Sequence, residues 1–287
     1  MINCSKSLIN YCMKISYDKN IQTNKIHLKK ILSRILNINY EKFLSYENIY
    51  LSDKKKKKFL RNYFFFLNSK PLSKIFGYKE FYSNEFFVSK NCLDPRPDSE
   101  LLVSDALDIM LSDSKKKAIL ELGVGSGCVL ISLILELKKK NKKFFSIGSD
   151  ICDKALEIAK KNVRKFNLTH EIRLISSDWF DNIKNNFDLI VVNPPYIKSN
   201  SIRTLDQKVR NFDPLKALDG GKNGLEKFEL ISQKINLFLK KEGKVLVEVG
   251  YNQSDSVIKI FEKQRLKLIK LSFDINGVCR CLTFGKN

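Results

Sequence analysis

The tetrapeptide Asn193-Pro194-Pro195-Tyr196 is the most chemically specific feature of this sequence. An amide nitrogen is a poor nucleophile because its lone pair is delocalised into the carbonyl, so a site that modifies it must orient it accurately. The Asn193 side-chain oxygen can accept one N–H of a planar target, and the Pro194 carbonyl can accept the other. The prolines hold the backbone extended, and Tyr196 offers a flat face for stacking. These four residues are predicted to be catalytic and to bind a planar amide or amine whose nitrogen receives a methyl group.

A glycine-rich loop, Gly123 to Gly127, lies between a strand pattern and a helix pattern upstream of this motif. Glycine lets the backbone turn tightly and approach a ligand closely. A nicotinamide-binding fingerprint would place Gly or Ala at position 128, but this chain has Cys128. The GxGxG spacing therefore favours S-adenosylmethionine as the cofactor. The loop residues predicted to bind it are Gly123, Val124, Gly125, Ser126 and Gly127.

Three further side chains follow predicted strands and complete the expected cofactor site. Asp150 ends the second strand, where a carboxylate can accept hydrogen bonds from both hydroxyls of a ribose. Asp178 and Trp179 follow the third strand, where a carboxylate can receive the adenine amino group and an indole can cover the ring. Capping of a helix is the alternative role for Asp150, and ordinary packing is the alternative for Trp179. Asn193 is predicted to contact the cofactor as well as the target.

Strand and helix patterns alternate from residue 118 to the C-terminus. Such alternation is typical of βαβ units and of a mostly parallel, doubly wound sheet, which binds ligands at the carboxyl ends of its strands. The predicted strands are 118–122, 144–149, 172–175, 189–192, 244–249, 266–274 and 280–284. The predicted helices among them are 128–138, 154–166 and 224–239. The predicted fold class is α/β, with a Rossmann-like, mostly parallel seven-stranded sheet.

The chain before residue 76 is predicted to form a small helical bundle. Apolar residues recur at three- and four-residue steps between Ile26 and Leu36. Ser52 and Asp53 are typical of a helix start, and the run Lys54 to Lys58 fits an exposed first turn. Phe64-Phe65-Phe66 is more apolar than one buried stripe requires. Packing in the core is the simpler interpretation, and contact with a second domain or a partner is the alternative.

A predicted hairpin and an extended segment connect the bundle to the α/β region. The β-prone runs 78–82 and 86–88 predict the hairpin, with its turn at 83–85. Two prolines in Pro95 to Glu100 then force an extended backbone before Ser99, a residue type that begins helices. The predicted domains are a helical domain at 1–75, a hairpin linker at 76–93 and a catalytic domain at 94–287.

The composition is that of an ordinary globular protein, with 43% hydrophobic and 29% charged residues. A formal net charge of +21 suggests nucleic-acid binding, because a basic surface attracts phosphate. However, only 9 of the 52 basic residues are Arg, the type preferred for bidentate recognition of phosphates and bases. A solvated lysine surface is the simpler interpretation, so stable nucleic-acid binding is not predicted.

Seven cysteines and two histidines show no spacing typical of a metal site, and no metal is predicted. The longest apolar stretch, Cys128 to Leu137, is shorter than the roughly 20 residues that span a bilayer, so no membrane association is expected. The scattered cysteines without a secretory leader favour a cytoplasmic location. The first 20 residues also lack the Arg-rich amphipathic character of a transit peptide.

Together these motifs resemble those of the HemK/PrmC family, the release factor glutamine methyltransferases. The resemblance covers nearly the whole chain. It rests on Pro71 to Gly77, Glu80-Phe81-Tyr82, Pro95 to Glu100, the glycine loop and Asn193 to Tyr196. Pro95 to Glu100, with the sequence PRPDSE, is the most discriminating segment, because the NPPY motif is shared with adenine-amine methyltransferases. Further matches lie at 213–214, 217–221, Asp274, Gly277 and Arg280.

The resemblance implies that the enzyme methylates the glutamine amide in the Gly-Gly-Gln tripeptide of class I peptide chain release factors. The products would be N5-methylglutamine and S-adenosylhomocysteine. It also implies that the loop glycines, Asp150, Trp179 and Asn193 bind S-adenosylmethionine, and that the N-terminal domain recognises the release factor. The enzyme is expected to be a monomer. The chain departs from the family pattern at Asp94 and Asp213, which leaves substrate fit open.

Two other functions fit parts of the sequence. An adenine methyltransferase acting on RNA or DNA would share the NPPY motif and suit the positive charge, but no target-recognition domain for nucleic acid is visible. A noncatalytic cofactor-binding protein that pairs with release factors or ribosomes would not need an intact acceptor motif. The intact motif at Asn193 to Tyr196 favours the enzyme.

Overall fold

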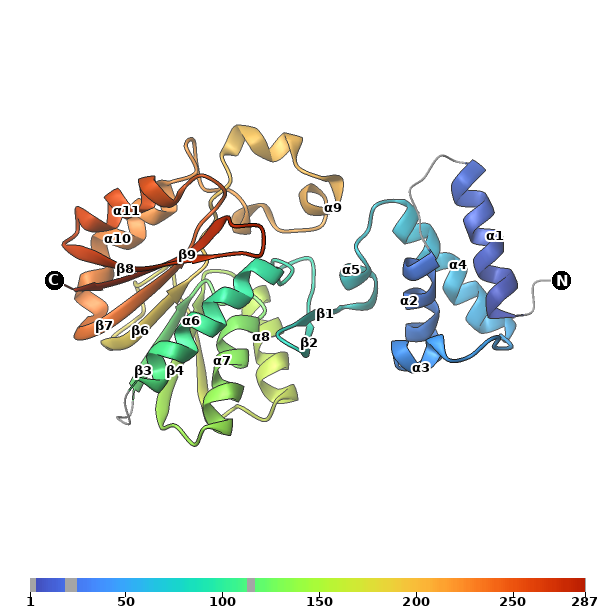
Figure 1. The fold of residues 1–287 in the computed structure, drawn as a ribbon, viewed down its shortest axis with the longest axis horizontal. Coiled ribbons are helices and arrows are strands. Elements are labelled where there is room, and N and C mark those ends of the chain that lie inside the picture. Colours follow the sequence, from blue (N-terminus) through green and yellow to red (C-terminus); the bar gives the residue numbers. More distant parts are fainter. Residues whose placement is uncertain (1–3, 19–24, 113–116, 287) are drawn as a thin grey trace. The chain divides into compact units, whose positions relative to one another are not determined.

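The computed structural model describes residues 4–18, 25–112 and 117–286. The chain divides into two compact units, Met1–Phe76 and Gly77–Asn287. Figure 1 shows helices in the first unit and a central sheet flanked by helices in the second. The helices of the first unit are α1 (Ser5–Asp18), α2 (Lys25–Leu36), α3 (Tyr40–Leu44), α4 (Asp53–Leu67) and α5 (Leu72–Phe76).

The first unit has a hydrophobic core of its own. Leu28, Ile31 and Leu32 of α2 are fully buried, as the three- and four-residue spacing predicts. Phe59 of α4 joins the same cluster. The run Phe64 to Phe66 is divided: Phe66 packs against this core, whereas Phe64 and Phe65 are exposed. Core packing is therefore wrong for two of these three phenylalanines, because α4 turns them away from the other helices.

The second unit begins with a two-stranded hairpin, β1 (Tyr78–Phe81) and β2 (Asn84–Phe87). Phe81 and Phe86 are buried in one of the main hydrophobic clusters of this unit. The turn consists of Tyr82 and Ser83, both with positive φ, so it lies earlier than the predicted turn at 83–85. A two-residue turn of this kind matches the right-handed twist of the strands, although the residue types here are not its usual ones.

The main sheet has seven strands in the order β5-β4-β3-β6-β7-β9-β8. The first five in this order are parallel, and β9 runs antiparallel to both β7 and β8. The predicted α/β fold with a mostly parallel seven-stranded sheet is confirmed. The strands are β3 (Lys117–Leu122), β4 (Phe144–Asp150), β5 (Ile172–Ser176), β6 (Phe187–Val192), β7 (Leu239–Glu248), β8 (Leu266–Phe273) and β9 (Cys279–Lys286).

Helices cover both faces of this sheet (Figure 1). Alternate residues of each strand point to opposite faces, so Ile119 and Leu120 of β3 belong to different hydrophobic clusters. One cluster includes apolar residues of α6 (Glu100–Leu111), α7 (Cys128–Lys139) and α8 (Asp153–Lys165). The other includes residues of α10 (Glu226–Phe238) and α11 (Ser254–Glu262). The two layers hold the carboxyl ends of the parallel strands in fixed register.

The observed starts of α10 and β7 differ from the predicted ones for identifiable reasons. Helix α10 begins at Glu226 and not at Gly224, because Gly224 has a φ of +77° that a right-handed helix does not allow. Strand β7 begins at Leu239 and not at Lys244. Residues 240–242 are polar and lack the apolar pattern that marks a strand, yet the strand extends back to Leu239, which pairs with Phe187 beyond an irregularity in the ladder.

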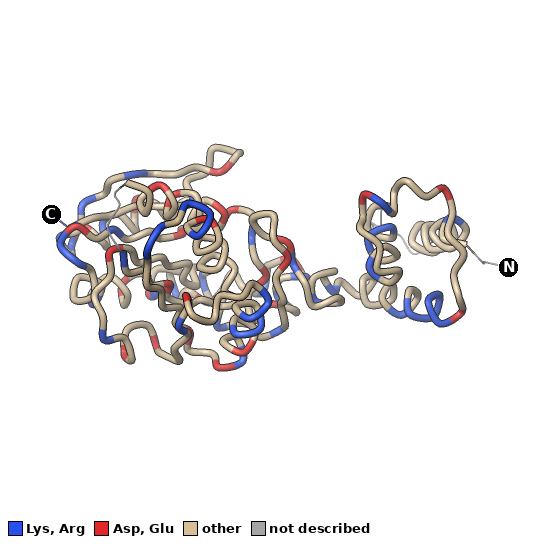
Figure 2. Tube along the Cα trace, turned by 90° about the horizontal axis from the view of Figure 1, so that it is seen from below, with Lys and Arg blue, Asp and Glu red and all other residues tan. Residues whose placement is uncertain are grey.

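Charged residues are spread over helices and loops of both units, with acidic residues among the basic ones (Figure 2). The lysine run 54–58 lies in the first turns of α4, where Lys56 pairs with Asp53 at 3.1 Å. Within the part of the chain that the structure describes, no helix is long and apolar enough to cross a bilayer.

Candidate active site

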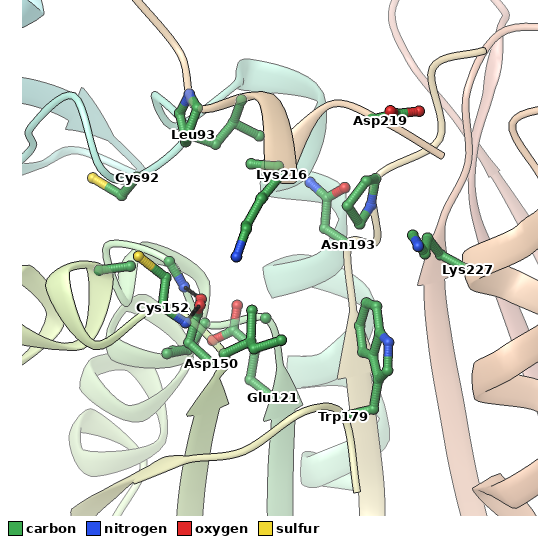
Figure 3. Close-up of a pocket in the computed structure, with 18 of the residues that line it drawn as sticks. Cys92, Leu93, Glu121, Asp150, Cys152, Trp179, Asn193, Lys216, Asp219 and Lys227 are labelled. Atoms are coloured by element: carbon green, nitrogen blue, oxygen red, sulfur yellow. Dashed lines mark hydrogen bonds between the residues drawn. The ribbon is translucent and has the colours of Figure 1, made fainter. Parts of the chain in front are cut away.

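A cavity of about 1000 Å³ is lined by the residues that directly follow β3, β4, β5 and β6. Its size is at the upper end of the roughly 300–1,000 Å³ common for small-molecule sites. Of the residues predicted for the site, those lining it are Gly123, Val124, Gly125, Ser126, Asp150, Asp178, Trp179, Asn193 and Pro195. Gly127, Pro194 and Tyr196 are not among the lining residues. Figure 3 shows Asp150, Trp179 and Asn193 around the same space.

The glycine loop connects β3 to α7 through three residues with positive φ, namely Gly123, Gly125 and Gly127. A Cβ at Gly123 would meet no atom within 4 Å, so the loop leaves open space there. Gly127 has a second constraint, because a Cβ would lie 3.0 Å from Cδ1 of Ile131. The loop therefore presents bare backbone toward the cavity while α7 packs closely behind it.

Asp150 ends β4 and holds this loop in place. Its Oδ2 accepts the Gly125 N–H at 2.8 Å, and its Oδ1 accepts the Cys152 N–H at 2.8 Å. Burial raises the pKa of the carboxyl, while these two hydrogen bonds act in the opposite direction. Each oxygen retains a second lone pair, so the carboxylate can also accept hydrogen bonds from hydroxyl groups of a ligand.

Glu121 is a second acidic residue of the cavity lining, at the carboxyl end of β3. It is 5% exposed, and its Oε2 accepts the Leu130 N–H at 2.9 Å near the start of α7. Burial raises its pKa well above the usual range, and nearby Asp150 contributes in the same direction. Glu121 was not among the predicted site residues, although its position two residues before Gly123 was the available signal.

Asp178 and Trp179 follow β5 on the far side of the cavity (Figure 3 labels Trp179). Trp179 has a φ of +44°, and its side chain packs partly against the cluster beneath α10. The Ser177 hydroxyl donates to the Trp179 carbonyl at 3.0 Å, which ties down this turn. Asp178 is exposed at the rim. Both residues thus line the cavity from the turn that follows β5.

Asn193 follows β6 and is linked to two buried side chains. Its Nδ2 donates to the Ser99 hydroxyl oxygen at 3.2 Å. The Ser99 hydroxyl donates to Oε2 of Glu248 at 2.5 Å. Ser99 and Glu248 are 3% and 2% exposed. Ser99 precedes α6 but makes no capping bond with its side chain, so its hydroxyl serves this chain of contacts and not the helix end.

Tyr196 lies behind the cavity lining. Its ring packs against the cluster that includes α10 and α11, and its hydroxyl donates to Oε1 of Glu248 at 3.4 Å. Burial raises the pKa of Tyr196, and the Glu248 carboxylate raises it further. The Tyr196 carbonyl accepts a hydrogen bond from Nε2 of Gln253 at 3.0 Å. The backbone of the motif is therefore fixed from the β7 side as well as from β6.

The two positions that depart from the family pattern contact each other. Asp213 accepts the Asp94 backbone N–H at 3.2 Å and a guanidinium N–H of Arg96 at 2.6 Å. The Asp213 side chain is 4% exposed. These contacts join the segment Pro95–Glu100 to the segment that contains Asp213, and Asp213 forms an ion pair with Arg96.

Comparison with known proteins identifies relatives. The methyltransferase small domain family matches residues 83–209. A protein of Agrobacterium fabrum (strain C58), the release factor glutamine methyltransferase, is 39% identical over 75% of this chain and 74% of its own length. The chain belongs to the release factor glutamine methyltransferase family. The resemblance of its motifs to that family is thereby confirmed. A bifunctional methyltransferase of Rickettsia prowazekii (strain Madrid E) is also 39% identical to this chain. The match covers 68% of this chain and 40% of that longer protein.

Solved structures support the fold. The catalytic domain of hMettl16, solved in complex with MAT2A 3'UTR hairpin 6, has a TM-score of 0.55 at 15% identity. The match covers 82% of this chain and 83% of that one. At this identity the likeness concerns the fold alone, and the predicted methyltransferase fold is confirmed.

Lys216 is another cavity residue that the sequence reasoning did not single out. It belongs to the short η3 helix (Leu215–Ala217), and Figure 3 shows its side chain extending into the cavity between Asn193 and Asp150. Nothing in the sequence separates Lys216 from the many other lysines. Only the path of the chain over the cavity brings it there.

Gly220 holds the acceptor motif at a distance that a larger residue would not allow. A Cβ at Gly220 would lie 2.7 Å from Cα of Tyr196 and 2.8 Å from the Pro195 carbonyl oxygen. Gly220→Ala should therefore displace the motif by a few tenths of an ångström and lower kcat by about tenfold, because misalignment of reacting groups is costly. Steady-state kinetics, with the affinity for S-adenosylhomocysteine measured by calorimetry, tests this effect.

Gly277→Ala is the matched control for this substitution. Gly277 has a φ of +74°, but a Cβ there would meet nothing within 4 Å. This variant should lose stability through backbone strain of about 1–2 kcal/mol while kcat stays unchanged. Gly220 does not have a positive φ, so an equal loss of kcat in both variants would show that a general loss of stability, and not displacement of the motif, causes the effect.

Proposed function

We propose that this protein methylates the side-chain amide of glutamine in the Gly-Gly-Gln motif of class I peptide chain release factors, using S-adenosylmethionine. The products are N5-methylglutamine and S-adenosylhomocysteine. The proposal rests on one observation in a chain of this family. Asn193 lines the same cavity as the glycine loop and Asp150.

The cavity residues fit the cofactor. Open space at Gly123 leaves room for a ligand against the loop backbone. Asp150 is proposed to accept the ribose hydroxyls, Asp178 to accept the adenine amino group, and the Trp179 ring to cover the base. Bound S-adenosylmethionine supplies an electrophilic methyl group on its sulfonium. The protein residues then have to place the glutamine nitrogen in line with that group.

Orientation of the target amide is assigned to the acceptor motif. The Asn193 Oδ1 atom accepts one N–H of the glutamine, and the Pro194 carbonyl accepts the other. These acceptors fix the nitrogen and its lone pair toward the methyl group, an effect worth up to roughly 7–11 kcal/mol in favourable cases. A general base is not required, because the methylated amide can release its proton after transfer. Tyr196 is proposed to shape the side of the site that receives the planar amide.

The N-terminal unit, residues 1–76, is proposed to recognise the release factor. It has its own core, and it exposes Phe64 at 62% and Phe65 at 38% on α4. Exposed aromatic side chains are common at sites of protein recognition. The enzyme is proposed to act as a monomer without stable nucleic-acid binding. The scarcity of arginine supports the absence of stable nucleic-acid binding.

Transfer of label from S-adenosylmethionine tests this function directly. The enzyme is incubated with a class I release factor, with the variant of that factor whose Gly-Gly-Gln glutamine is alanine, and separately with total nucleic acid. Label should appear on the intact release factor and be lost in the alanine variant. Label on nucleic acid with none on the release factor would instead favour an adenine methyltransferase and reject the proposal.

A further inference from the structure

Glu248 is a buried acid beside the acceptor motif that no motif of the sequence indicated. It is the last residue of β7 and is 2% exposed. A buried carboxylate is costly unless hydrogen bonds compensate for lost hydration. Two hydroxyl groups do so here: the Ser99 hydroxyl donates to Oε2 at 2.5 Å, and the Tyr196 hydroxyl donates to Oε1 at 3.4 Å. Glu248 thus contacts both the PRPDSE segment and the NPPY motif.

Asn193, Ser99 and Glu248 are joined by hydrogen bonds, and the single hydroxyl proton of Ser99 determines which group donates in each of them. A serine hydroxyl has one proton, and an ionised carboxylate can only accept. Because Ser99 donates its proton to Glu248, its oxygen can only accept from Asn193. The partner atom must then be Nδ2 of Asn193, which lies 3.2 Å from the Ser99 oxygen. The opposite edge of the Asn193 amide, which carries Oδ1, is left to accept a hydrogen bond.

We propose that Glu248 and Ser99 are positioning residues for methyl transfer, because they hold the Asn193 amide with its oxygen available to accept an N–H of the substrate amide. The inference rests on the proposed function and deepens it. Without this contact the Asn193 amide can turn by 180° and present its own NH2 group to the NH2 group of the glutamine. Two donors would then face each other, and the target nitrogen would lose one of its two acceptors.

The charge state of Glu248 determines which groups donate and which accept in the hydrogen bonds that join it to Ser99 and Asn193. Burial raises the pKa of Glu248 to about 7, and nearby Asp98 also raises it, while hydrogen bonds from Ser99, Asn193 and Tyr196 lower it. Once protonated, the carboxyl can donate to Ser99, and the Ser99 proton can then turn toward Asn193 and reverse the amide. Three more groups act on this cluster: Arg96 and Arg280 lie near Tyr196, and Cys281 lies near Glu248. The active form is the ionised one, so kcat should rise as pH increases through about 7.

Three variants test the inference: Ser99→Ala, Ser99→Thr and Glu248→Gln. The assays measure kcat and KM with a release factor from pH 6 to 9, the affinity for S-adenosylhomocysteine, and the midpoint of thermal unfolding. Ser99→Ala should lower kcat about tenfold, the scale of one hydrogen bond, with affinity and midpoint retained. Ser99→Thr keeps the hydroxyl and should restore kcat to within about twofold of wild type. Glu248→Gln should lower kcat and remove its rise near pH 7.

Ser104→Ala is the matched control, because Ser104 is an exposed serine of α6, the helix that follows Ser99, and its hydroxyl bonds only locally to the Glu100 carbonyl. It should leave kcat unchanged. Wild-type kcat and pH profile in Ser99→Ala, or equal losses in the alanine and threonine variants, would overturn the inference alone. If the wild-type enzyme transfers no label to the release factor, the proposed function fails and the inference fails with it.

Discussion

Asn193→Ala should lower kcat by about 10²- to 10³-fold and leave the fold intact, as when a preorganised polar contact is deleted from an active site. Alanine removes the Oδ1 acceptor assigned to the target amide. It also removes the Nδ2 donor to Ser99, but Ser99 still bonds Glu248. Steady-state kinetics with a release factor measures the loss. Binding of S-adenosylhomocysteine should weaken by no more than about tenfold, because one neutral hydrogen bond contributes roughly 0.5–1.5 kcal/mol.

Asn200→Ala provides the control, since Asn200 is exposed and lies seven positions further along the same connection. Its kcat should equal that of wild type. Turnover of Asn193→Ala within about tenfold of wild type would contradict the acceptor role, because a single orienting contact in a preorganised site is worth more than that. A kcat loss matched by an equal loss of cofactor affinity would instead assign Asn193 to cofactor binding.

Much of the fold could be predicted because local pattern and tertiary structure agree in the second unit. Strands such as β3 are apolar on both faces, which is typical of a parallel strand covered by helices on each side. The start of β7 did not follow this rule. Its residues 240–242 are polar and exposed, and only pairing with β6 extends the strand there. Pairing partners are set by tertiary structure, which a local pattern does not contain.

The predicted site residues were found because each follows a strand whose carboxyl end lies at one edge of the sheet. Nine of them line one cavity, including Asp150, Trp179 and Asn193. Their individual roles stay predictions. Tyr196 illustrates the limit, because its type suggested a stacking face, whereas the chain directs its hydroxyl toward Glu248. Residue type gives a set of possible contacts, and the surrounding packing selects among them.

Ser99 and Glu248 could not have been paired from the sequence. They are 149 positions apart and meet because α6 begins over the carboxyl end of β7. Ser99 also had a sufficient local explanation as a helix-starting residue. Lys216 had the opposite difficulty, since it is one of many lysines without a distinctive neighbour. In both cases the missing information is a long-range contact and not a residue preference.

Asp150→Asn should weaken binding of S-adenosylmethionine and S-adenosylhomocysteine by roughly 10- to 100-fold, because hydrogen bonds to a charged group contribute about 1.5–3 kcal/mol. The carboxylate accepts backbone N–H groups on both oxygens, from Gly125 and from Cys152. An asparagine has only one oxygen, so its NH2 group must face one of these donors. The substitution therefore loosens the glycine loop and removes acceptors for the ribose. Calorimetry with S-adenosylhomocysteine measures the loss.

Asp153→Asn is the matched control, because Asp153 is an exposed acid in the first turn of α8 and should leave cofactor affinity unchanged. Comparison with the 2′-deoxy analogue of S-adenosylhomocysteine separates the two roles of Asp150. If Asp150 accepts the ribose 2′-hydroxyl, the substitution should cost the analogue less affinity than it costs the parent ligand, because the contact is already missing. Equal losses for both ligands would contradict a contact between Asp150 and the ribose 2′-hydroxyl.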